Sequence, residues 1–220
     1  MTCITDLTPP GYVVVEGPIG VGKTSLVKRL AESFNSEMLL ENAEENPFLE
    51  RFYQDGRQAA LPTQLFFLFQ RCQQLQTLRQ KDMFCSALVA DFMLEKDPLF
   101  ARLNLDDDEL KLYEQVYERL TMEAPAPDLV VYLQAPVEIL LQRIKKRDRQ
   151  AERMMAADYL QKLCDGYTEF FYHYNRSPLL IINATDINPV ENDADYQLLL
   201  ERICSIRRGK HYFNPAPLLL

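Results

Sequence analysis

Three of the seven glycines in this chain of 220 residues fall between Gly17 and Gly22. They belong to the segment GPIGVGKT, from Gly17 to Thr24, which matches the pattern G-x-x-x-x-G-K-[ST]. The apolar run Tyr12–Val15 precedes this segment, and apolar residues at helical spacing follow it from Ser25. A strand, a glycine loop and a helix in this order predict a phosphate-binding loop, because the loop N–H groups and the helix amino end both attract an anion.

The residue types in this loop suit a nucleoside triphosphate such as ATP. Lys23 is long enough to reach the β- and γ-phosphates as a catalytic cation, and the hydroxyl of Thr24 can hold Mg²⁺. The residues expected to contact ATP here are Gly17, Pro18, Ile19, Gly20, Val21, Gly22, Lys23, Thr24 and Ser25. The alternative is a glycine turn before an ordinary helix. The loop alone also does not distinguish kinases from GTPases or motor ATPases.

Apolar periodicity predicts an α/β fold along the rest of the chain. Short apolar runs predict five strands, at Tyr12–Val15, Met38–Leu40, Ala87–Ala90, Leu129–Leu133 and Leu179–Ile182. Helical spacing predicts six helices, at Ser25–Phe34, Leu61–Leu78, Glu109–Leu120, Pro136–Lys146, Asp158–Tyr174 and Ala194–Ile206. Because strands and helices alternate, we expect one P-loop domain over residues 1–220. It should hold a five-stranded parallel sheet with helices on both faces and a ligand crevice at the carboxyl ends of the strands.

An acidic residue follows the second predicted strand at that crevice. Glu41 comes directly after Met38–Leu40. From there its carboxylate can accept the proton of an attacking hydroxyl, so we expect Glu41 to be the general base. Since Glu44, Glu45 and Glu50 are close by in the sequence, the alternative is a solvated acidic face.

A second acidic residue follows the third predicted strand. Asp91 comes directly after Ala87–Ala90, the position from which phosphate-loop proteins supply a metal-associated carboxylate. We therefore expect Asp91 and Thr24 to hold Mg²⁺. The alternative role for Asp91 is to cap a helix that begins at Phe92.

A basic run, RIKKRDR, ends the helix predicted at Pro136–Lys146. Its arginines are Arg143, Arg147 and Arg149, and cations at a helix carboxyl end are favourable in any case. A mobile arginine lid over ATP would also neutralise charge on the transferring group and exclude water. A lid in the same chain, with no N-K-x-D sequence for guanine recognition, favours a small-molecule kinase over a regulated GTPase.

Charge and composition narrow the classes of partner. The net charge of −8 argues against a surface that binds duplex nucleic acid. No stretch of about 18 apolar residues occurs, and the first ten residues lack a signal-peptide pattern, so we expect no membrane partner and a cytoplasmic location. The five cysteines are scattered, which makes a disulfide framework or a zinc site unexpected.

Taken together, these segments resemble the deoxynucleoside kinase family, specifically its bacterial deoxyadenosine/deoxyguanosine kinase branch, from Tyr12 to about Ile203. The segment ENAEENP, from Glu41 to Pro47, is similar to the family stretch E-P-V-E-D-N-P, which implies that Glu41 is the catalytic base. The basic run fits the lid pattern R-x-x-x-R-x-R-x-x-E, closed by Glu152. The resemblance implies that Arg147 acts in catalysis and that Arg143 and Arg149 contact ATP.

The resemblance also implies roles in substrate binding. Tyr53 and Glu152 would hold the sugar 3′-hydroxyl, while the residues that would read the base edge are Gln64, Arg71 and Asp97. Phe67 and Phe100 would form walls for the base, although either could instead be packed in the core. Asp186 lies in a loop that would touch the adenine of ATP, unless that loop is a plain surface turn. A homodimer packed through helices and feedback inhibition by a deoxynucleoside triphosphate are further implications.

The sequence departs from the family pattern at two positions. Asn42 stands where a proline is usual, and Phe92 stands where many members have the arginine of D-R-S, which would touch the catalytic base and the phosphates. Phe92 leaves a catalytically weak nucleotide-binding regulator as one alternative. A nucleoside monophosphate kinase resembling thymidylate kinase is another, and Arg71 would then have to bind the acceptor phosphate.

The chemistry of the base edge leaves several substrates open. The Gln64 amide can pair with any of the four bases. An ionised Asp97 can only accept hydrogen bonds, so it suits an exocyclic amino group and disfavours the carbonyl of thymine. Deoxyadenosine, deoxyguanosine and deoxycytidine remain possible on this argument. Only the resemblance favours the purines.

Overall fold

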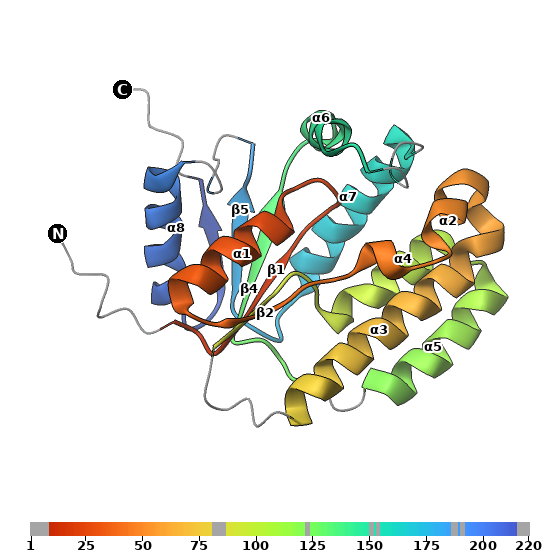
Figure 1. Cartoon of the computed structure of the whole chain (residues 1–220), viewed down its shortest axis with the longest axis horizontal. Coiled ribbons are helices and arrows are strands. Elements are labelled where there is room, and N and C mark those ends of the chain that lie inside the picture. The colour runs from red at the N-terminus through yellow and green to blue at the C-terminus, as the bar shows by residue number, and fades with distance from the viewer. Residues whose placement is uncertain are drawn as a thin grey trace.

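The computed structural model describes residues 9–80, 87–121, 124–149, 152, 155–185, 189 and 192–214. Six parallel strands form one sheet in the order β2-β3-β1-β4-β5-β6 (Figure 1). Their bounds are Tyr12–Glu16 (β1), Glu37–Leu39 (β2), Leu88–Ala90 (β3), Leu129–Gln134 (β4), Leu179–Asn183 (β5) and Lys210–Phe213 (β6). The parallel sheet is confirmed, but the expectation of five strands is wrong.

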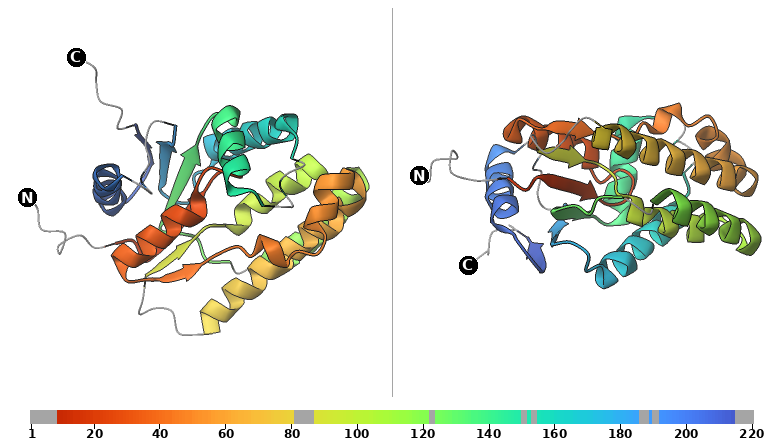
Figure 2. Two further views of the ribbon diagram at one scale, coloured as in Figure 1. Left: turned by 45° about the horizontal axis from the view of Figure 1, so that its top comes forward. Right: turned by 90° about the horizontal axis from the view of Figure 1, so that it is seen from below.

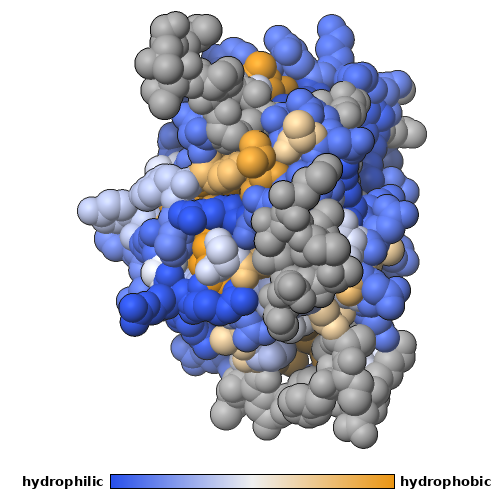
Figure 3. All heavy atoms as spheres, turned by 90° about the vertical axis from the view of Figure 1, so that its left-hand side faces the viewer, coloured by the Kyte–Doolittle hydropathy of each residue, from blue (hydrophilic) through white to orange (hydrophobic). Residues whose placement is uncertain are grey.

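The missed strand, β6, lacks the sequence signal of a buried strand. It pairs only with β5, so it forms an edge of the sheet, and its side chains are exposed or half-buried. Lys210 and His211 interrupt any apolar run, and the Tyr212 side chain is 74% exposed. Figure 3 faces this side of the molecule and shows mainly hydrophilic residues around a narrow apolar band. An edge strand needs fewer apolar residues than a central one, so the hydrophobic pattern did not reveal it.

Eight α-helices accompany the sheet in the described part of the chain. Their bounds are Lys23–Phe34 (α1), Leu49–Asp55 (α2), Ala60–Gln80 (α3), Asp97–Asn104 (α4), Asp107–Thr121 (α5), Val137–Arg147 (α6), Ala157–His173 (α7) and Asp193–Ser205 (α8). All six predicted helices are present. The two that were missed, α2 and α4, have 7 and 8 residues, too few turns to show a helical apolar period.

The helices cover both faces of the sheet. On one face α1 packs against β1, β2 and β3. On the other, the rings of Tyr167 and Phe171 from α7 stack on Tyr132 of β4. Figure 1 shows α1 in front of the strands and α7 behind them. Because both faces are covered, β1 and β4 are apolar and buried almost throughout, as Val13–Val15 illustrates.

A helical subdomain extends beyond the carboxyl ends of the strands. Helices α3, α4, α5 and α7 pack against one another there (Figure 2). The crevice between this layer and the loop after β1 is where the sequence predicts the site. No helix in the described ranges is both long enough and apolar enough to cross a membrane.

Candidate active site

The loop between β1 and α1 is shaped by its glycines. Gly17 has φ 146° and Gly20 has φ 84°. A Cβ on Gly17 would lie 2.4 Å from the carbonyl oxygen of Leu133, and one on Gly20 would lie 2.9 Å from that of Leu140. Neither position can accept a larger residue without moving the neighbouring backbone. The loop is therefore pressed against β4 and α6.

Lys23 begins α1 and reaches back over the loop. Its Nζ donates to the carbonyl oxygen of Gly17 at 2.7 Å and to that of Pro18 at 3.3 Å. Burial, and then the charge of Lys96, lowers the pKa of Lys23 to about 8. A phosphate would favour the charged form and give the ammonium group a stronger acceptor than a carbonyl. The geometry agrees with the predicted contact between Lys23 and the phosphates.

Asp91 joins the loop to the predicted base. Its Oδ2 accepts a hydrogen bond from the Thr24 hydroxyl at 2.7 Å, and its Oδ1 accepts one from the backbone N–H of Glu41 at 2.7 Å. The next helical turn starts after Met93 and has no side-chain cap, so the alternative that Asp91 caps a helix is wrong. The carboxylate is 3% exposed and directed to both predicted groups.

The oxygen donors of Thr24 and Asp91 fit a magnesium ion. Mg²⁺ prefers a few protein oxygens and completes its shell with water and phosphate oxygens. No group of three or more His, Cys, Asp or Glu side chains that could hold a metal occurs among the described residues. An ion at this position would therefore depend on the nucleotide for part of its coordination.

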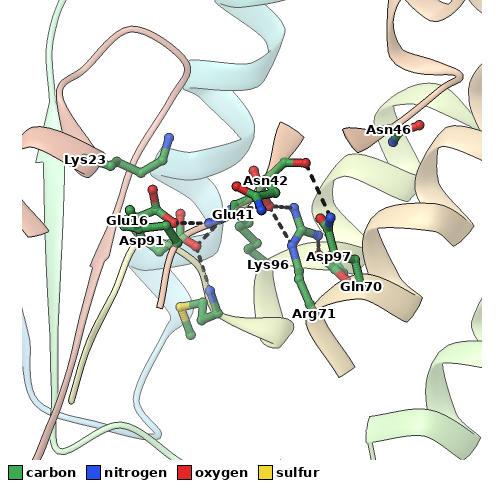
Figure 4. Close-up of polar contacts among 12 residues, drawn as sticks. Glu16, Lys23, Glu41, Asn42, Asn46, Gln70, Arg71, Asp91, Lys96 and Asp97 are labelled. Carbon is green, nitrogen blue, oxygen red and sulfur yellow. Dashed lines mark hydrogen bonds and ion pairs between the residues drawn. The ribbon is translucent and has the colours of Figure 1, made fainter. Parts of the chain in front are cut away.

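Glu41 lies two residues beyond β2 with cations gathered on one carboxylate oxygen (Figure 4). Oε1 accepts hydrogen bonds from Nε of Arg71 at 2.7 Å and from Nη2 of the same guanidinium, and Nζ of Lys96 lies 3.9 Å away. Burial disfavours the ionised form, but Arg71, Lys96 and Lys23 lower the pKa of Glu41 to about 2. By contrast, the Glu44 side chain is 80% exposed. The solvated-face alternative thus describes Glu44 and not Glu41.

Two buried charged residues next to Glu41 were not predicted. Glu16 ends β1 and is fully buried, and its Oε1 lies 3.1 Å from Nζ of Lys96. The backbone N–H groups of Gly17 and Met93 and the hydroxyl of Tyr167 also donate to Glu16. The rule that pointed to Glu41 and Asp91, an acid at the end of a strand, would have found Glu16. No sequence signal marks Lys96, because only the fold brings it here.

The predicted substrate residues line the same cleft as the loop. The cleft is bordered by Tyr53, Gln64, Phe67, Arg71, Phe100 and Glu152, together with Lys23, Thr24, Glu41 and Asp91. Phe100 also packs against the core through Tyr167, with ring centroids 6.0 Å apart, so packing in the core does not remove it from the cleft. The Phe67 ring lies 5.1 Å from the Arg71 guanidinium carbon.

Asp97 lies behind Arg71 and is not among the residues that line the cleft. Its Oδ1 pairs with Nη1 of Arg71, while its Oδ2 is buried without a hydrogen-bond partner among the described residues. Burial raises the pKa of Asp97 to about 6, although Arg71 and Lys96 oppose that change. Asp97 can therefore reach a ligand only through Arg71 or after a small rearrangement.

The predicted lid arginines differ in their contacts. Arg143 donates to the carbonyl oxygens of Val21 at 3.2 Å and Ala184 at 2.9 Å, so it supports the loop. Arg147 donates to Glu152, and Arg149 lies 3.4 Å from Glu44. The guanidinium groups of Arg147 and Arg149 thus border the cleft, and each is paired with a glutamate. Asp186, predicted to contact adenine, lies outside the described residues.

The chain is similar in sequence to known proteins. The sequence model of the family described as "Deoxynucleoside kinase" matches residues 13–206. The chain is 34% identical to a deoxyguanosine kinase of Bacillus subtilis (strain 168) over 159 residues, which cover 71% of this chain and 76% of that one. It is 30% identical to a deoxyadenosine kinase of Lactobacillus acidophilus over 205 residues, 86% of this chain and 93% of the relative.

A solved structure shows the same fold. The deoxyadenosine kinase from M. mycoides, with the products dCMP and a flexible dCDP bound, superposes with a TM-score of 0.77 at 25% identity. The superposition covers 89% of this chain and all of the other. The two folds therefore agree over most of this chain.

Proposed function

Because the chain belongs to the deoxynucleoside kinase family, we propose that it transfers the γ-phosphate of ATP to the 5′-hydroxyl of a deoxynucleoside, with deoxyadenosine or deoxyguanosine preferred. One observation carries this proposal. The two oxygens of Asp91 accept hydrogen bonds from the phosphate loop at Thr24 and from the backbone of the predicted base, Glu41. A nucleotide in the loop and a hydroxyl at Glu41 would consequently meet within one cleft.

The transfer needs little covalent chemistry from the protein. The loop and Lys23 hold the phosphates of ATP, and Mg²⁺ bound by Thr24 and Asp91 would neutralise part of their charge. Glu41 accepts the proton of the 5′-hydroxyl as that oxygen bonds to the γ-phosphorus. The bond from the γ-phosphorus to the β–γ bridging oxygen breaks, and ADP leaves. Arg147 and Arg149 stabilise charge on the transferring group.

The geometry of the cleft and the family resemblance together support the proposed roles on the acceptor side. Tyr53 and Glu152 hold the 3′-hydroxyl, and Gln64 and Arg71 face the base between Phe67 and Phe100. The preference for purines rests on the relatives, of which one is named a deoxyguanosine kinase and another a deoxyadenosine kinase. A homodimer, a cytoplasmic location and feedback inhibition by a deoxynucleoside triphosphate are carried over as predictions.

The monophosphate-kinase alternative is disfavoured by the contacts of Arg71. This residue is the only candidate proposed for the acceptor phosphate, and it is 4% exposed and bonded to both Glu41 and Asp97. A buried arginine already paired with two carboxylates has little capacity left for a phosphate.

An assay of the wild-type protein tests the proposal. The four deoxynucleosides and their four monophosphates are offered with ATP and Mg²⁺, and ADP release is measured. We expect activity with deoxyadenosine or deoxyguanosine and none with the monophosphates. Activity confined to monophosphates would establish the rival kinase, and binding of ATP without any turnover would establish the regulator.

A further inference from the structure

The catalytic carboxylate is held from one side only. Arg71 and Lys96 both approach Oε1 of Glu41, and no hydrogen bond or ion pair to Oε2 is made among the residues that the structure describes. Since Glu41 is only partly buried and borders the cleft, a hydroxyl in the cleft would find Oε2 without one of these cations. The orientation of the base thus depends on which cations hold Oε1.

The residue after Asp91 supplies no such cation. Phe92 is fully buried and apolar, and its ring lies 6.0 Å from the guanidinium carbon of Arg71. Lys96 follows in the short helical turn Leu94–Lys96 and extends to Glu41 from beneath (Figure 4). It is 2% exposed, borders the cleft, and its Nζ lies 5.8 Å from the ring centroid of Phe100.

Pairing with Glu16 accounts for Lys96 only in part. Its other partner, Glu16, already accepts hydrogen bonds from Gly17, Met93 and Tyr167. Burying this ion pair carries a desolvation penalty, and a well-packed apolar pair in its place would often be as stable, so stability alone does not require charge here. A cation placed 3.1 Å from Glu16 and 3.9 Å from Glu41 is better explained by its effect on the second carboxylate.

We propose that Lys96 is a positioning residue for Glu41, supplying the cation that Phe92 does not and keeping Oε2 directed at the acceptor hydroxyl. Arg71 shares this task but also faces the base and is bound to Asp97. For Lys96 no contact with the base of the acceptor is proposed. It is therefore the contact that holds Glu41 whichever base is bound. This inference rests on the function proposed above.

A double-mutant cycle tests the inference. Lys96→Met should lower kcat ~10-fold to 100-fold and change KM for ATP by less than about three-fold, as expected for a contact that acts on the transition state. Lys96→Arg should recover most of the loss. Adding Lys96→Met to Glu41→Gln should lower kcat by less than about two-fold more, because both substitutions act through the same group.

Controls separate folding from function. Lys162→Met removes an exposed lysine of α7 and should leave kcat unchanged. If Lys96→Met fails to fold because Glu16 loses its counter-charge, a second variant that combines Glu16→Gln with Lys96→Met removes both charges. This double variant should show the ~10-fold to 100-fold fall in kcat that is expected for Lys96→Met. Independent, multiplicative effects of Lys96→Met and Glu41→Gln would overturn the inference while leaving the proposed function intact. A wild-type protein that phosphorylates no deoxynucleoside would overturn both.

Discussion

Replacement of Glu41 by glutamine should change which group faces the 5′-hydroxyl, because the neighbouring cations fix the orientation of the side chain. Both cations lie on the Oε1 side, so the amide oxygen of glutamine should turn toward Arg71 and Lys96. The amide NH₂ then takes the place of Oε2 and presents a donor where the 5′-hydroxyl needs an acceptor. The variant should still fold, since Arg71 retains Asp97 and Lys96 retains Glu16.

The magnitude follows from the basicity of the group. General bases typically contribute ~10²-fold to 10⁴-fold. Because burial is outweighed by Arg71 and Lys96, the pKa of Glu41 is lowered to about 2, which makes it a weak base that acts largely by orienting the hydroxyl. We therefore expect the lower end of the range, a ~10²-fold fall in kcat, or about 2.7 kcal/mol of barrier.

The assay combines turnover with binding. ADP release with deoxyadenosine gives kcat, and titration calorimetry with ATP gives Kd, which should stay within about three-fold of wild type if Glu41 acts only on the acceptor. Glu50→Gln, on the exposed face of α2, is the matched control and should behave as wild type. A kcat within three-fold of wild type, with ATP still bound, would refute the assignment of Glu41.

Further predictions concern the lid, the base pocket and the loop. Arg147→Ala should lower kcat more than it raises KM for ATP, and an effect on KM alone would assign Arg147 to ground-state binding. Thymidine should have a kcat/KM ~10-fold to 100-fold below that of deoxyadenosine. Burial raises the pKa of Asp97 to about 6, so this carboxyl is ionised above that pH and protonated below it. After the small rearrangement that brings Asp97 to the base, its protonated form can donate to thymine. The discrimination should therefore weaken as the pH falls through 6, and an unchanged ratio would remove Asp97 from base reading. Gly20→Ala, at φ 84° and with a Cβ 2.9 Å from the Leu140 carbonyl oxygen, should lower the melting temperature and weaken ATP binding more than ~10-fold. Gly56→Ala, at φ 58° with nothing within 4 Å, introduces backbone strain without a steric clash. Equal effects of Gly20→Ala and Gly56→Ala would contradict the predicted clash with Leu140.

The parts of the fold that could be predicted depend on local sequence. The phosphate loop, the buried strand before it and the helix after it are encoded within a few consecutive residues. The acids Glu41 and Asp91 could be placed because parallel strands bring their carboxyl ends to one edge. In contrast, β6 is stabilised by β5 alone, and the residues of α2 and α4 are too few to show periodicity.

The buried charged residues show most clearly which parts of the site could not be predicted from the sequence. Lys96 is 80 residues from Glu16 and 55 from Glu41 along the chain, and nothing in its neighbours distinguishes it from a solvated lysine. Its contact with both acids exists only because β1, β2 and the turn after β3 converge. The same holds for Arg143, which was predicted as part of the lid but bonds to the backbone at Val21 and Ala184.

The close approach of Gly20 to α6 makes that helix a rigid strut between the phosphate loop and Arg147. The loop rests on the Leu140 carbonyl and on Ile144, and Arg143 ties the same helix to Val21. The separation between the loop and the last residue of the strut, Arg147, is therefore set by the scaffold. Any swing of Arg149 toward ATP has to pivot after that point, where Asp148 adopts φ 52°, and cannot come from bending the loop.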